Sequence, residues 1–166
     1  MLLKSKEIAY LGVLLGLNQL FIILSSVIET NTIILMSGAA LIIGIIIVEF
    51  SLKNGIVFYA ASCLLGYALT FNKIEIFTYI IFFGTYSIVK HLIETKIINM
   101  LIQYILKFIY FNIVLLILYF VINLFITLNL SWWMILAGEA LFFIYDYAFT
   151  IFINVYIDKI KPKVFK

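Results

Sequence analysis

Six long apolar runs dominate this chain and restrict it to very few folds. Of its 166 residues, 66% are hydrophobic and only 11% are charged. Most runs reach the roughly 20 residues that cross a 30 Å hydrocarbon core as a helix. Soluble domains are only about half apolar, so a soluble fold is excluded. The runs do not alternate apolar and polar residues, which disfavours a membrane β-barrel.

We therefore expect an all-α integral membrane protein with six transmembrane helices in one bundle. The bundle should form a single domain, residues 1–166. The inner connection 93–103 is expected to be long and amphipathic, whereas the outer connections should be short. The apolar runs predict helices at 8–28, 33–50, 56–71, 76–92, 104–126 and 132–157.

The lysines predict how the bundle is oriented. With a cytoplasmic N-terminus, ten of the eleven lysines lie at the inner face and only Lys73 lies outside, as the positive-inside rule requires. Both termini are thus predicted to be cytoplasmic. The net charge of +3 then reflects topology and contact with anionic membrane lipid, and we expect no nucleic-acid partner. The inner lysines are Lys4, Lys6, Lys53, Lys90, Lys96, Lys107, Lys159, Lys161, Lys163 and Lys166.

Two acids stand in the last apolar run. Glu139 and Asp146 are seven residues apart, so on a helix they share one face and are separated by roughly 10 Å along the axis. Asp146 falls near the middle of the run, where a charge costs at least a few kcal/mol. We expect Asp146 to be protonated or paired, and Lys107 is a candidate partner by its depth alone. The separation argues against one shared proton and for successive positions along a pocket wall.

Polar side chains also occur inside the other runs. Asn18 and Gln19 lie in the middle of the first run, and Asn112, Tyr119 and Asn123 share one helical face of the fifth. Together with the two acids they predict a polar chamber, because amides and carboxylates that face lipid are unfavourable. The alternative for the amides is hydrogen bonding between helices that only holds the bundle together.

Small residues indicate where helices approach closely. Gly12 and Gly16 form a GxxxG motif on the first helix, and such spacing permits backbone contact within membranes. The motif predicts either packing inside the bundle or a docking face for another subunit.

Enzyme chemistry is not indicated by the sequence. His91 and Cys63 are the only residues of their kinds, and neither belongs to a catalytic or metal-ligand pattern. We expect no catalytic residues, no metal and no cofactor. The segment 82–94 looks like a distinctive signature without an evident chemistry, and within it Lys90 and Glu94 have the spacing of a helical ion pair.

These features resemble the substrate-binding S components of energy-coupling factor (ECF) transporters, which import vitamins and related micronutrients. The resemblance covers nearly the whole chain and rests on six helices, inner termini, basic inner turns and the glycine face. It implies a multi-pass protein of a bacterial-type plasma membrane. It also implies docking of Gly12 and Gly16 onto an energy-coupling transmembrane subunit that works with two ATPase subunits. The implied substrate-binding residues are Asn18, Tyr119, Asn123, Trp132, Trp133 and Glu139, with Asp146 at the pocket floor.

Two other functions stay open. One is a non-transport membrane scaffold, similar in size and helix count to the rod-shape protein MreD. The other is a small proton- or cation-coupled carrier that uses the two acids as relay groups. A scaffold should hold its acids in saturated pairs, whereas an S component should have a polar site that is reachable from outside.

Overall fold

The structure is a computed structural model that describes residues 5–127 and 131–161. It contains six helices that are long and apolar enough to cross a membrane, and no strand occurs within these ranges. The predicted all-α class is confirmed. Three of the inner lysines and part of the outer connection 127–131 lie outside the described residues, namely Lys4, Lys163, Lys166 and residues 128–130.

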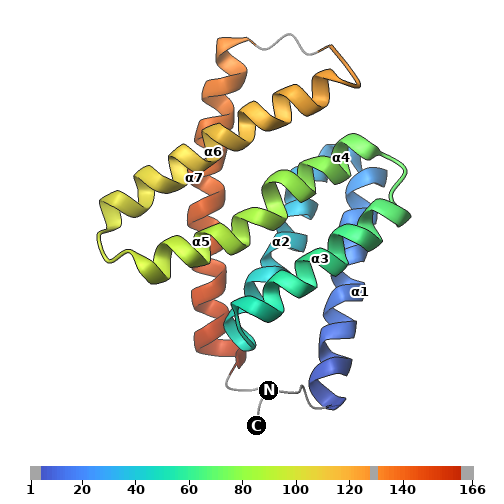
Figure 1. Cartoon of the computed structure of the whole chain (residues 1–166), viewed down its shortest axis with the longest axis vertical. Coiled ribbons are helices and arrows are strands. Elements are labelled where there is room, and N and C mark those ends of the chain that lie inside the picture. Colours follow the sequence, from blue (N-terminus) through green and yellow to red (C-terminus); the bar gives the residue numbers. More distant parts are fainter. Residues whose placement is uncertain (1–4, 128–130, 162–166) are drawn as a thin grey trace. The chain divides into compact units, whose positions relative to one another are not determined.

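Helical elements follow one another with short connections (Figure 1). The second element, η1, is a 3₁₀ turn of three residues. The elements η2 and η3 are π-helical and continue longer helices. Thus α4, η2 and α5 form one span of 24 residues, and η3 extends α7. The elements are α1 (Ser5–Val27), η1 (Glu29–Asn31), α2 (Thr32–Glu49), α3 (Leu52–Leu69), α4 (Lys73–Thr78), η2 (Tyr79–Gly84), α5 (Thr85–Lys96), α6 (Met100–Asn123), α7 (Trp132–Val155) and η3 (Tyr156–Ile160).

The inner connection between the fourth and fifth spans is shorter than expected. We predicted a long stretch over 93–103, but α5 continues to Lys96 and α6 begins at Met100. Asn99 starts α6, since its side-chain oxygen accepts hydrogen bonds from two backbone N–H groups of the first turn. The prediction was wrong because charged residues in the last turn of α5 were interpreted as a loop.

Two compact units make up the chain, Met1–Leu92 and Ile93–Lys166. The expectation of a single domain, residues 1–166, stays a prediction. In the first unit α1, α2 and α3 pack against one another, and the fourth span packs on α2. Large apolar side chains of this unit are almost fully buried: Ile22, Met36, Ile43, Ile46 and Ile76.

A buried polar network crosses the core of the first unit. Asn18 Nδ2 donates to the carbonyl of Ala39 at 2.8 Å and to the hydroxyl of Tyr79 at 3.0 Å. Ser62 Oγ donates to Asn18 Oδ1 at 2.6 Å, and Gln19 Nε2 donates to the carbonyl of Ser62 at 3.1 Å. These groups join α1, α2, α3 and η2. The side-chain oxygen Oε1 of Gln19 is buried without a hydrogen-bond partner, whereas Asn18 is bonded through both its amide nitrogen and its amide oxygen. In an apolar interior these bonds favour one arrangement of helices, because a shift would leave further polar groups unpaired.

The π-helical turn η2 is held by a side chain from α3. Tyr59 donates its hydroxyl to the carbonyl of Ile80 at 2.7 Å, and its ring packs where a side chain at Gly84 would stand. A π-helical turn departs from the regular i to i−4 pattern and widens the helix locally. The absence of a Cβ at Gly84 is what allows the tyrosine ring to approach this turn.

We predict that Gly84→Ala destabilises the protein by about 1–3 kcal/mol, as overpacking commonly does. A Cβ at this position would lie 2.4 Å from Cε2 of Tyr59, so the ring or the turn must move. The measurement is the free energy of unfolding in mixed detergent micelles. Gly16→Ala is the matched control, because nothing lies within 4 Å of a Cβ there. Equal stability of both variants would contradict this account of η2.

Candidate functional site

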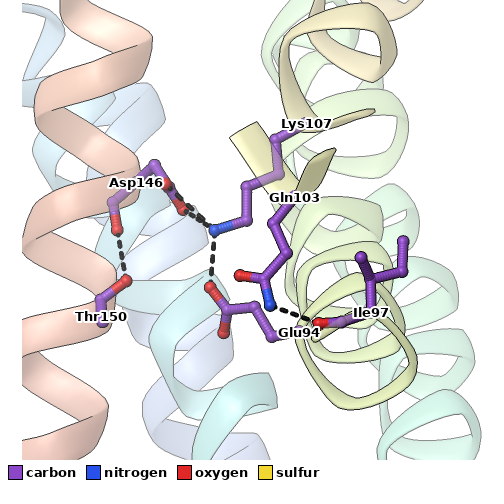
Figure 2. A network of polar contacts seen from close by, with 6 residues as sticks. All are labelled: Glu94, Ile97, Gln103, Lys107, Asp146 and Thr150. Atoms are coloured by element: carbon purple, nitrogen blue, oxygen red, sulfur yellow. Dashed lines mark hydrogen bonds and ion pairs between the residues drawn. The ribbon is translucent and has the colours of Figure 1, made fainter. Parts of the chain in front are cut away.

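A buried ion pair joins α6 to α7 in the second unit. Nζ of Lys107 lies 3.2 Å from both carboxylate oxygens of Asp146, and the two side chains are only 4% and 6% exposed. The same ammonium donates to Oε1 of Glu94 at 2.6 Å, and the side chain of Glu94 is 34% exposed. Figure 2 shows the lysine reaching between the two acids. Asp146 is therefore paired, with the partner that its depth had suggested.

Neighbouring polar groups hold the backbone on both sides of this network. Thr150 Oγ1 donates to the carbonyl of Asp146 at 3.0 Å, one turn further along α7. Gln103 Nε2 donates to the carbonyl of Ile97 at 2.6 Å, which closes the connection between α5 and α6 (Figure 2). The Thr150 bond holds the turn of α7 that follows Asp146. The Gln103 bond holds the connection between the helices that carry Glu94 and Lys107. The three charged groups are thus presented by ordered helix segments.

Aromatic rings pack directly beside the ion pair. Phe111 and Phe142 stack with centroids 4.3 Å apart and planes inclined by 9°. Phe108 and Phe143 stack at 5.9 Å and 14°. Along each helix the residues of the ion pair and of the two stacks lie within about one turn of one another, and all three contacts join α6 to α7. Figure 1 shows these two helices crossing. Burial of both side chains strengthens the attraction between the charges and makes an unpaired charge there unfavourable.

On α6, the side that contacts α7 continues outward from the crossing. Leu115 follows Phe111 by four residues, and Tyr119 follows Leu115 by four. Side chains at this spacing share one face of a helix. Both are partly buried. The face that carries the stacked rings therefore leads to the Tyr119 phenol.

On α7, the corresponding side carries the second acid. Glu139 precedes Phe143 by four residues, and Trp132 precedes Glu139 by seven, so all three share one face. Glu139 is partly exposed and makes no hydrogen bond or ion pair with any described residue. The two acids of the last helix thus differ: Asp146 is neutralised at the crossing, and Glu139, roughly 10 Å along the axis from it, is not.

Other predicted site residues have different surroundings. Asn123 donates its amide to the carbonyl of Tyr119 on its own helix at 2.9 Å, and Trp132 and Trp133 are 83% and 80% exposed. Asn18 belongs to the hydrogen-bonded network of the first unit and is fully buried. Within the described residues of the second unit, no hydrogen bond or ion pair joins Glu139 to Tyr119 or Asn123. The substrate-binding role of these residues stays a prediction.

Gly12 and Gly16 lie on an open face of α1. Both are exposed, and no atom of the first unit lies within 4 Å of a Cβ built at either position. The motif therefore does not pack against another helix of the first unit, and the expectation of packing inside the bundle stays a prediction.

The sequence did not single out two contributors to the buried networks. Glu94 was interpreted as a partner of Lys90 on its own helix, and Ser62 only as a small packing residue. Glu94 contacts Lys107, thirteen residues ahead, because α5 and α6 are joined by a tight turn. A signal was available: Lys107 lies seven residues inside the fifth span, too deep to be a terminal lysine without a partner.

Metal binding finds no support in the described part of the chain, where no three side chains of His, Cys, Asp or Glu come together. Comparison with protein-family models, with curated proteins and with solved structures finds no match. Any functional assignment therefore rests on the chemistry of the site.

We predict that Lys107→Met lowers the free energy of unfolding by about 3–5 kcal/mol, since it leaves the buried carboxylate of Asp146 unpaired. Asp146→Leu should lower it by less, because Lys107 keeps its contact with Glu94. The double variant should lose much less than the sum, because no charge is stranded. Unfolding of the four proteins in mixed micelles measures the coupling. Lys159→Met, at an exposed lysine of η3, should change stability by no more than about 0.5 kcal/mol. Additive losses would contradict a direct pair.

Proposed function

We propose that this protein is a membrane-embedded substrate-capture subunit that binds a small molecule in its outer half and docks onto a partner membrane protein. The proposal agrees with the resemblance to S components of ECF transporters. The observation that carries it is Glu139, a carboxylate within an apolar span that has no partner among the described residues.

Glu139 lies within an apolar span and has no charged partner among the described residues, so its presence there calls for a functional explanation. Ionisable groups inside membrane spans are unfavourable, and they usually mark ligand or ion sites. The neighbouring Asp146 shows how this chain treats a structural acid: it is buried, and Lys107 neutralises it. Glu139 is treated differently, although it lies on the same helix face. This contrast supports a binding role for Glu139 and a structural role for Asp146 at the floor of the site.

Docking would use the glycine face of α1. Gly12 and Gly16 leave the helix backbone open over about one turn, and such surfaces allow another helix to approach closely within a membrane. In the S-component model the partner is an energy-coupling transmembrane subunit with its ATPase subunits. The partner would then supply the nucleotide chemistry.

A scaffold function similar to MreD is the second candidate, and the saturated Lys107 network favours it. If the protein is a scaffold, its acids should only stabilise the fold. Glu139 is the point on which the two functions differ, because a scaffold gives this acid no task.

Native mass spectrometry of the purified protein should detect a co-purified small molecule. We predict that Glu139→Gln lowers ligand retention by roughly tenfold or more, as expected when a charged hydrogen-bond partner is removed. Glu29→Gln, an exposed acid of η1, should retain the ligand and serves as the control. If the protein carries no small molecule in any preparation, the capture function is wrong and the scaffold is favoured.

We also predict that Gly12→Leu and Gly16→Leu together abolish co-purification with a co-expressed energy-coupling module. Folding should be preserved, because no atom of the first unit occupies this space. Ala60→Leu, on the exposed face of α3, is the matched control and should leave the complex intact. A complex that survives both glycine substitutions would disprove this docking face.

A further inference from the structure

We infer that the ligand held at Glu139 is an organic ammonium ion with an apolar or aromatic body. This inference rests on the proposed capture function and assigns the substrate class of that same site.

Charge requires a cation at Glu139. In the second unit the ammonium of Lys107 is already shared between Asp146 and Glu94. In the predicted topology the one outer lysine of the chain is Lys73, and its ammonium already donates to the carbonyls of Tyr67 and Thr70 at 2.8 and 2.9 Å. No basic side chain pairs with Glu139 in the part of the chain that the structure describes, so a cationic ligand would be its counter-ion.

A bare metal ion does not suit this position. Hard cations need several oxygen ligands, and no group of three potential metal-binding residues exists in the described ranges. One carboxylate in apolar surroundings matches the single charge of an ammonium group instead.

The surfaces beside Glu139 are apolar and aromatic. Phe143, one turn inward on α7, is 47% exposed, and Leu136, one turn outward, is 55% exposed. Trp132 lies two turns outward on the same face and is 83% exposed. Aromatic rings beside a carboxylate attract organic cations both through their faces and through apolar contact. An ammonium group on a hydrocarbon or ring body fits this combination.

Carbodiimide labelling tests the inference directly. Dicyclohexylcarbodiimide modifies carboxyl groups in apolar surroundings, and peptide mass spectrometry locates the adduct in protein held in lipid nanodiscs. We expect an adduct at Glu139 and none at Asp146, which is engaged by Lys107. Phenethylammonium should slow the labelling of Glu139 by about tenfold when saturating, as loss of access to a charge-paired group implies. Neutral 2-phenylethanol, anionic phenylacetate and sodium chloride should not slow it.

Two variants complete the test. Glu139→Gln should lose the adduct, and Glu139→Asp should restore both labelling and protection by the amine, while both unfold at the parent temperature. Equal protection by the amine, the alcohol and phenylacetate would overturn the inference, as would an absence of protection by the amine. If the co-purified molecule proves neutral or anionic, the ammonium assignment fails and capture stands. If no molecule is captured at all, the proposed function fails first.

Discussion

The ion pair between Lys107 and Asp146 determines how the second unit is built. Two helices that pass through an apolar medium gain little from apolar contact alone, since lipid offers the same contact. A lysine and an aspartate that are almost fully buried and 3.2 Å apart hold α6 and α7 at one point, and two ring stacks fill the space beside them. Every residue further outward on these helices is placed by that crossing.

The network around Asn18 in the first unit is built from neutral groups instead. An amide, two hydroxyls and a backbone carbonyl on four helical elements satisfy one another around Asn18. The side chains that bond around Asn18 carry no charge. It leaves the outer surface of α1 unused, and the two glycines on that surface are the feature available to a partner. Capture and docking would thus belong to different units of one chain.

Six spans were predictable because each depends on a local pattern of apolar residues. The side chains that pair between different helices were much harder to predict from the sequence. The sequence indicated the pairing of Asp146 with Lys107 only because both residues lie at a similar depth in their helices. The contact of Glu94 with Lys107 depends on a connection of three residues between α5 and α6, where the charged residues had suggested a longer loop. The bonding of Asn18 with Tyr79 joins residues 61 positions apart, and no helical spacing indicates such a contact. Periodicity gives the face of a helix, but the crossing of two helices decides which faces meet.

Chain order gives the charged network a consequence for biogenesis. Lys107 is synthesised 13 residues after Glu94 and 39 residues before Asp146. When α6 emerges from the ribosome, the aspartate that will pair with its lysine is still inside the exit tunnel. Glu94 is the counter-ion at hand during this interval. The partly exposed Glu94 near the end of α5 can thus pair with Lys107 until α7 follows and brings Asp146.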